Sequence, residues 1–67
     1  MKAISGKEMC RILARHGWKH VRTRGAHFTY EKPGRISITV PVHGNKTLKT
    51  GLQRGIMKDA GLTEDDP

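Results

Sequence analysis

Three short runs near the middle of the chain alternate apolar and polar residues, and a glycine-containing link separates each run from the next. The runs cover residues 18–24, 27–31 and 35–40. Alternation with a period of two is typical of strands that bury one face. Short links that contain glycine or proline favour tight turns, which join antiparallel neighbours. The pattern therefore predicts a three-stranded antiparallel meander.

The alternation also predicts which side chains share a face of this sheet. The apolar set should point towards the helices: Phe28, Tyr30, Ile36, Ile38 and Val40. The alternate set should lie on the opposite, open face: His27, Thr29, Ser37 and Thr39. His27 is thus expected to begin a strand on the solvent side of the sheet.

Helix signals precede the strand runs. Ser5, followed three residues later by Glu8, matches a capping box. An apolar stripe at helical spacing comes next, made of Met9, Ile12 and Leu13. Gly17 is placed to end this helix in the left-handed conformation. The segment is predicted to be an amphipathic helix.

A second helix is predicted after the strands. Thr47 suits its N-cap position and Gly61 its end. Its apolar stripe is Leu48, Leu52 and Ile56. Gly51 and Gly55 would weaken an isolated helix, so we expect them to allow close approach of this helix to the sheet.

The resulting order is helix, three strands, helix, within a single domain over residues 1–67. Two helices on one face of an antiparallel sheet make an α+β fold, in the element order of double-stranded RNA-binding domains. Residues 63–67 are expected to be a frayed acidic tail. A chain this short builds a small core, so a tight partner or oligomerisation is an expected source of further stability.

The charge of the chain is strongly positive and unevenly placed. Its formal net charge is +7, and all 13 lysines and arginines lie between Lys2 and Lys58. Only Glu8 and Glu31 oppose them within that range. Such an excess favours an anionic partner. Charge alone does not decide between a nucleic acid and an acidic protein.

Several classes of protein are not supported by the sequence. No apolar run resembles a signal peptide or a membrane span, so we expect a soluble cytoplasmic protein without membrane contact. Cys10 is the only cysteine, which excludes an internal disulfide. His16 and His20 are four residues apart, but Gly17 breaks the helix that such a metal pair would need. We therefore predict no metal and no cofactor.

The chain resembles the HicA toxin family, the small mRNA interferases of HicA/HicB toxin–antitoxin pairs. The segments that carry the resemblance are Gly17-Trp18, Gly25-Ala26-His27, residues 40–44, Leu48, Gly51 and residues 56–62. Family members often read Gly-Ser-His, and many have a second histidine next. Here Ala26 and Phe28 hold those positions. This chain therefore lacks a serine hydroxyl beside the histidine.

The resemblance implies a fold like that of double-stranded RNA-binding domains and a catalytic role for His27. It also implies a HicB-type antitoxin that neutralises the toxin in a hetero-oligomer. The antitoxin, and not this chain, would be expected to bind operator DNA. On spacing alone, a single strand histidine is more often an ordinary surface residue, so the resemblance is what favours catalysis.

The expected chemistry is metal-independent cleavage of mRNA. His27 would remove the proton from a ribose 2′-hydroxyl, which then attacks the adjacent phosphorus. Arg22, Arg24 and Lys32 are the nearest candidates for phosphate contacts. His43 precedes a predicted helix N-terminus, where it could contact RNA or fix the loop by hydrogen bonding.

Two other functions remain open from the sequence. The chain could be a non-catalytic RNA-binding module in which His27 is only a contact residue. It could also be a basic adaptor whose partner is an acidic protein. Cleavage products that end in a cyclic phosphate would separate the first alternative from an endoribonuclease.

Overall fold

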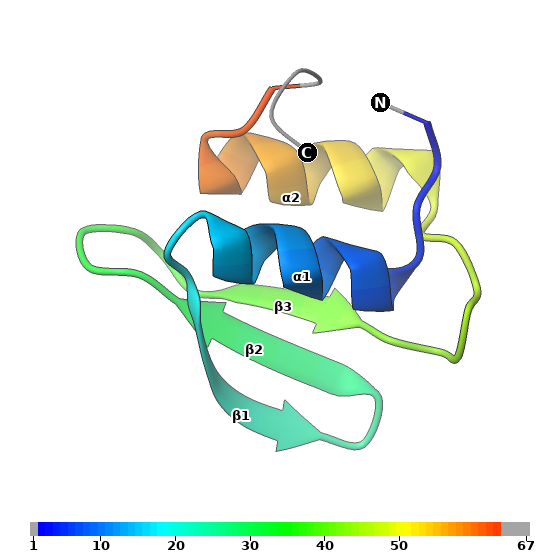
Figure 1. Cartoon of the computed structure of the whole chain (residues 1–67), viewed down its shortest axis with the longest axis horizontal. Helices are drawn as coiled ribbons and strands as arrows, with labels where there is room; N and C mark the ends of the chain where they lie inside the picture. The colour runs from blue at the N-terminus through cyan, green and yellow to red at the C-terminus, as the bar shows by residue number, and fades with distance from the viewer. Residues whose placement is uncertain (1, 64–67) are drawn as a thin grey trace.

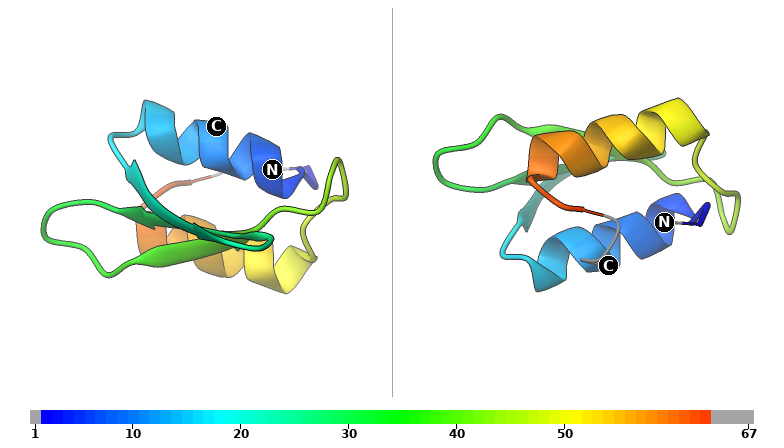
Figure 2. Two further views of the ribbon diagram at one scale, coloured as in Figure 1. Left: turned by 90° about the horizontal axis from the view of Figure 1, so that it is seen from below. Right: turned by 90° about the horizontal axis from the view of Figure 1, so that it is seen from above.

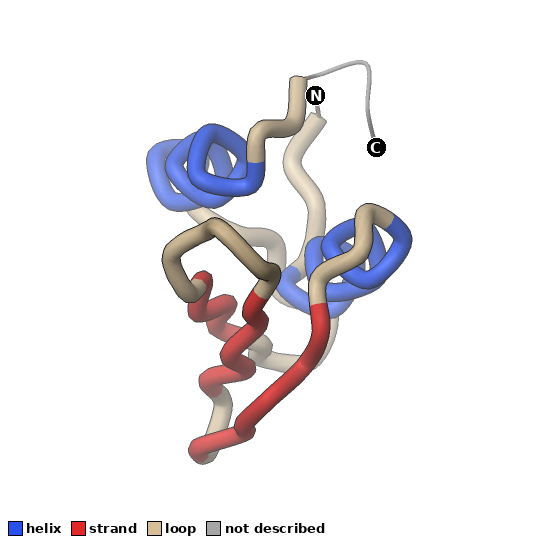
Figure 3. Tube along the Cα trace, turned by 90° about the vertical axis from the view of Figure 1, so that its left-hand side faces the viewer, coloured by secondary structure: helices blue, strands red, loops and turns tan. Residues whose placement is uncertain are grey.

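The computed structural model describes residues 2–63, which form two helices and one sheet. The elements follow in the order α1 (Gly6–Arg15), β1 (Lys19–Arg24), β2 (His27–Glu31), β3 (Ile38–Pro41) and α2 (Thr50–Ala60). The three strands form an antiparallel sheet in the order β1-β2-β3. Both helices lie on one face of this sheet and run in the same direction (Figures 1 and 3). The predicted α+β fold and element order are confirmed.

Helix α1 begins and ends as its sequence predicts. The Ser5 hydroxyl oxygen accepts a hydrogen bond of 3.1 Å from the backbone N–H of Glu8. At the other end, Gly17 has a φ of +89°, and the Trp18 N–H donates to the Leu13 carbonyl at 3.0 Å. A left-handed glycine after a helix satisfies its last carbonyls in this way. Trp18 is thereby turned back into the core beside Leu13.

The start of α1 lies unusually close to the end of β3. A Cβ atom on Gly6 would collide with the Pro41 carbonyl oxygen and would lie 3.1 Å from the Cα of Val42. Glycine is the residue that allows this backbone approach, because it has no Cβ. Close packing by a helical glycine therefore occurs in α1.

In α2, the predicted role of Gly51 and Gly55 is wrong. A Cβ on either glycine would meet nothing within 4 Å, and both residues are exposed. The buried face of α2 is rotated relative to the prediction, so Leu52 is 41% exposed and Gln53 is only 5% exposed. The amide of Gln53 accepts from the Ile4 N–H and donates to the Lys2 carbonyl, both at 3.0 Å. Gln53 therefore joins α2 to the N-terminal segment.

The prediction of Thr47 as a helix N-cap is also wrong. The N-cap is Lys49, whose side chain makes no capping hydrogen bond. Thr47 instead forms an isolated antiparallel bridge with Ser5, and the Leu48 N–H donates to the Ile4 carbonyl at 2.8 Å. Pairing with the N-terminal segment holds this backbone extended, which delays the start of the helix.

The third strand is shorter than predicted at its beginning and includes Pro41 at its end. It begins at Ile38, and Ile36 is 70% exposed where the alternation placed it against the helices. Pro33 has no N–H to donate to a ladder, and Gly34 turns the chain with a φ of +78°. Ile36 therefore lies in the irregular link between this turn and β3.

The core lies between the helices and the sheet and centres on Met9, Leu13 and Val40, which have no exposed surface. Cys10 and Tyr30 also belong to it and share a hydrogen bond. Burial raises the pKa of the Cys10 thiol and, with the Cys10 contact, raises the pKa of Tyr30 to about 12. Neither helix among residues 2–63 has the length and apolar character needed to cross a bilayer.

Candidate functional site

His27 is the first residue of β2 and follows the Gly25-Ala26 hairpin turn directly. Its strand partners are Arg24 on β1 and Pro41 on β3. The Val42 N–H donates to the Ala26 carbonyl at 2.7 Å, which fixes the chain just before the histidine. The backbone of His27 is thus held on both sides while its side chain is exposed.

His27 lies in a hollow of about 520 Å³ on the open face of the sheet. We call it the His27 hollow, and its lining residues are Arg22, Arg24, His27, Thr29 and Thr39. All three strands contribute to it, because Arg22 pairs with Thr29 and Thr29 pairs with Thr39. The hollow combines an imidazole, two guanidinium groups and two hydroxyls. Such a set can bind an anion and accept a proton beside it.

A β-bulge in β1 determines which side chains reach this face. His20 pairs with Tyr30 and Arg22 pairs with Thr29, so Val21 is an extra residue in the ladder. Strict alternation would place His20 on the same face as Arg22. Instead, the His20 ring lies on the other side, 5.4 Å from Phe28 and 5.5 Å from Tyr30. Bulges often redirect side chains next to active sites in this manner.

The two threonines of the His27 hollow were predicted on the open face but not as site residues. Their hydroxyls lie 3.3 Å apart and share a hydrogen bond. Thr29 is only 5% exposed because its neighbours cover it, whereas Thr39 is exposed. Thr29 lies two residues from His27 on β2, on the same face, and this spacing was the signal that could have identified it; Thr39 lies directly across from Thr29 on β3.

The structure does not bring Lys32 and His43 to the His27 hollow. Lys32 is at the other end of β2, where its Nζ donates to the His16 carbonyl at 2.7 Å, at the C-terminus of α1. His43 is exposed in the β3–α2 loop and lines a separate hollow of about 330 Å³ with Pro41 and Leu52. An RNA contact by either residue stays a prediction. Arg22 and Arg24, in contrast, lie beside His27 as expected.

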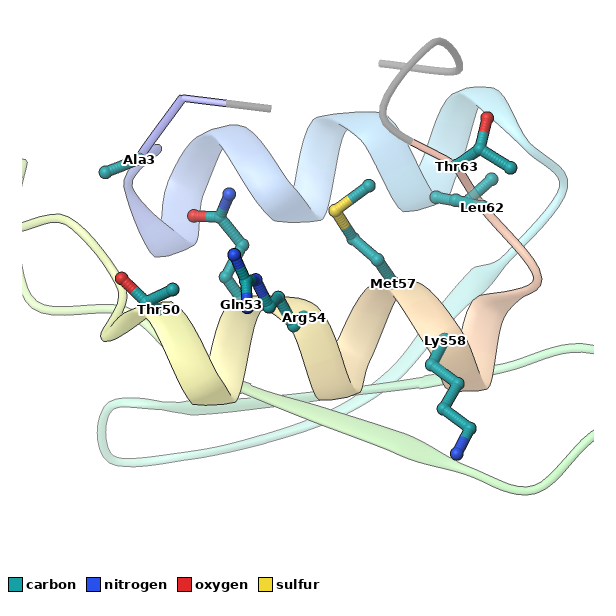
Figure 4. Close-up of a pocket in the computed structure, with 8 residues that line it drawn as sticks. All are labelled: Ala3, Thr50, Gln53, Arg54, Met57, Lys58, Leu62 and Thr63. Atoms are coloured by element: carbon teal, nitrogen blue, oxygen red, sulfur yellow. The ribbon is translucent and has the colours of Figure 1, made fainter.

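Another hollow, of about 420 Å³, lies between α2, the N-terminal segment and residues 62–63 (Figure 4). Its ionisable residues are Arg54 and Lys58, and Met57 and Gln53 line its inner side. It has no imidazole or carboxylate that could accept a proton. Within residues 2–63, no group of three histidine, cysteine or acidic side chains is arranged to hold a metal ion. The His27 hollow is therefore the better candidate for chemistry.

The chain was compared with known protein families and solved structures. A family described as "HicA toxin of bacterial toxin-antitoxin" matches residues 6–62. A chain from a structure titled "Toxin-Antitoxin complex from Streptococcus pneumoniae" is 42% identical, with a TM-score of 0.74, over 88% of this chain and 98% of that one. A search of curated proteins found no match. The matched range includes the whole β1–β2 hairpin with His27, and we conclude that this chain belongs to the HicA toxin family.

Proposed function

We propose that this protein is the toxin of a toxin–antitoxin pair and acts as a metal-independent endoribonuclease on mRNA, with His27 as the general base. The observation that carries the proposal is the His27 hollow. One exposed imidazole lies there beside Arg22 and Arg24 on the face of a basic chain. Family membership supports a toxin, and the geometry supports the chemistry.

The reaction needs only groups that the RNA and this face provide. An unprotonated ring nitrogen of His27 accepts the proton of a ribose 2′-hydroxyl, and the 2′-oxygen bonds to the adjacent phosphorus. The bond from phosphorus to the 5′-oxygen breaks, and the leaving oxygen takes a proton from water. The products are a 2′,3′-cyclic phosphate and a 5′-hydroxyl end. A positioned general base of this kind contributes about 10²–10⁴-fold.

The arginines are proposed to stabilise the charge that develops on the phosphate. Arg24 is the cross-strand partner of His27, and Arg22 is the partner of Thr29, so both arginine side chains project from the face of the sheet that holds His27. Guanidinium groups bind phosphate oxygens in bidentate fashion. Thr39 is exposed in the same hollow and is placed to hydrogen bond to a ribose or phosphate oxygen.

We further propose a HicB-type antitoxin as the partner that neutralises this toxin. The related chain comes from a toxin–antitoxin complex, and the charge of +7 favours an acidic surface on such a partner. An antitoxin that covers the His27 hollow would block access of RNA. Its binding would also stabilise the folded state of this small domain by mass action. Binding of operator DNA is assigned to the antitoxin.

The test compares wild type with His27→Ala. Each is induced in cells, and growth and mRNA length are followed. Purified proteins are then incubated with RNA in excess chelator, and the ends of the products are analysed. We expect growth arrest, mRNA loss and cyclic phosphate ends with wild type alone.

The control is His43→Ala, which changes an exposed histidine outside the His27 hollow. At saturating RNA we expect it to keep single-turnover cleavage, whereas His27→Ala should not cleave. Normal cleavage by His27→Ala would refute the base assignment. RNA binding by wild type without any cleavage would favour the non-catalytic module, and binding only to an acidic protein would favour the adaptor.

A further inference from the structure

A second hollow, of about 460 Å³, lies on the same open face at the other end of the sheet. We call it the Val21 hollow, and its lining residues are Lys19, Val21, Glu31, Lys32, Pro33, Arg35 and Ser37. Lys19 pairs with Glu31 at this end, as Arg24 pairs with His27 at the other. His27 and Glu31 are four residues apart on one strand, about 13 Å at 3.3 Å per residue. Both side chains belong to the face that holds the His27 hollow.

The β-bulge gives this face a row of cations. Because Val21 is the extra residue, Lys19 and Val21 line one hollow of the open face while Arg22 and Arg24 line the next. Within residues 2–63, the side-chain ammonium of Lys19 has no hydrogen-bond or ion-pair partner. A row of unpaired cations along one strand matches the repeating phosphates of a single nucleic-acid strand.

The other two cations of the Val21 hollow lie beside the ends of the helices. Lys32 donates to the His16 carbonyl after α1, and the Arg35 guanidinium packs against Gly61 after α2. The β2–β3 turn that carries both residues extends past the C-terminal ends of the two helices (Figures 1 and 2). The hydrogen bond of Lys32 fixes one side of the hollow. Lys19 is the cation of this hollow that lies on a strand of the sheet, in line with Arg22 and Arg24.

The floor of the Val21 hollow is suited to a nucleoside. Val21 is an apolar residue that is 47% exposed, and Pro33 adds a second apolar surface. Beside them, the Ser37 hydroxyl donates to the Glu31 carboxylate at 3.1 Å. A carboxylate accepts hydrogen bonds from the exocyclic amino groups of bases.

We propose that the Val21 hollow binds a nucleotide that flanks the cleavage site on the same RNA strand. This inference rests on the proposed function. Lys19 binds the phosphate of that nucleotide, Val21 packs against its ribose or base, and Glu31 accepts a hydrogen bond from the base. Uracil has no exocyclic amino group. The hollow therefore favours cytosine, adenine or guanine over uracil at this position.

The first test measures RNA binding in the His27→Ala background, so that bound RNA stays intact. Lys19→Ala is compared with Lys7→Ala, which removes an exposed lysine from α1, behind the sheet. The ligands are an oligonucleotide that spans both hollows and, as a control, a dinucleotide long enough to fill the His27 hollow alone. We expect Lys19→Ala to lower the slope of log K against log salt by about 0.7 for the long ligand. The dinucleotide and Lys7→Ala should show no such change.

The second test measures base preference with long oligonucleotides that carry cytosine or uracil at each position in turn. Glu31→Gln should remove the discrimination against uracil, because an amide can donate to a carbonyl oxygen as well as accept. It should leave the salt slope unchanged. Thermal melts of all variants check that the fold is retained.

The outcomes separate this inference from the proposed function. If wild type cleaves RNA but Lys19→Ala binds as Lys7→Ala does, the Val21 hollow is not a nucleotide site. If Lys19→Ala or Val21→Asp weakens only a complex with the antitoxin, the hollow belongs to that partner and the inference is also overturned. If wild type fails to cleave but the binding differences appear, the nucleotide site stands without the nuclease.

Discussion

The same substitution, glycine to alanine, should have opposite effects in the two helices. At Gly6, the new Cβ would collide with the Pro41 carbonyl oxygen and would lie 3.0 Å from the Pro41 carbonyl carbon. The obstacle is backbone, and α1 cannot simply move away because Met9 and Leu13 are fully buried. Overpacking of this kind costs about 1–3 kcal/mol. We therefore expect Gly6→Ala to destabilise the fold despite the better helix propensity of alanine.

At Gly55, an added Cβ meets nothing within 4 Å in the middle of an exposed helix face. Only the propensity difference remains, so Gly55→Ala should stabilise the protein by about 0.5–1 kcal/mol. For a domain of this size, 1 kcal/mol changes Tm by about 4–8 °C, so the Tm values of the two variants should differ by roughly 6–30 °C.

Thermal unfolding followed by circular dichroism measures this difference directly. The effect should extend to function, because Pro41 is the cross-strand partner of His27. Gly6→Ala should therefore also slow RNA cleavage at temperatures where it is folded. A Gly6→Ala variant as stable as wild type, or a destabilised Gly55→Ala, would refute the assignment of close packing to α1 rather than α2.

Three further predictions test other parts of the structure. Gln53→Ala removes two buried hydrogen bonds to the N-terminal segment, and a lower urea midpoint should show a loss of about 1–3 kcal/mol. Thr39→Val keeps the shape of the side chain but removes its hydroxyl, so kcat should fall about two- to tenfold, and Tm should fall slightly because the Thr29 hydroxyl loses its partner. Tyr30 is the only tyrosine, and its pKa of about 12 lies above the ordinary value of 10. The stability that this shift provides is therefore complete below pH 10 and is lost as the pH rises to about 12. The absorbance of tyrosinate should report the ionisation of Tyr30 over this range. Tyr30→Phe should abolish the loss of stability.

The parts of the fold that the sequence predicted are those set by neighbouring residues. The Ser5 N-cap, the left-handed Gly17 and the bounds of β2 all depend on residues a few positions away along the chain. The position of His27 at the start of a strand was predicted for the same reason, because a glycine turn precedes it and a short alternating run follows it. Its proposed chemistry, however, came from the resemblance and not from the spacing.

The wrong predictions for α2 and for the residues just before it share a different cause, which is contact with a distant part of the chain. Thr47 is not a cap because its backbone pairs with Ser5. Leu52 is exposed because Gln53 turns towards the N-terminal segment and takes the inner face of α2. A sequence pattern read within one helix contains no information about a segment more than 40 residues away.

The β-bulge at Val21 shows how such a contact also decides the site. Period two in residues 19–24 would place His20, Arg22 and Arg24 on one face, and nothing local marks Val21 as the extra residue. It becomes extra only because Tyr30 and Thr29 are adjacent on β2 while their partners His20 and Arg22 are not adjacent on β1. The bulge sends His20 to the side of Phe28 and Tyr30, and it leaves both arginines beside His27. This one extra residue thus places the His20 ring beside Phe28 and Tyr30, on the face opposite that of His27, which is proposed to react.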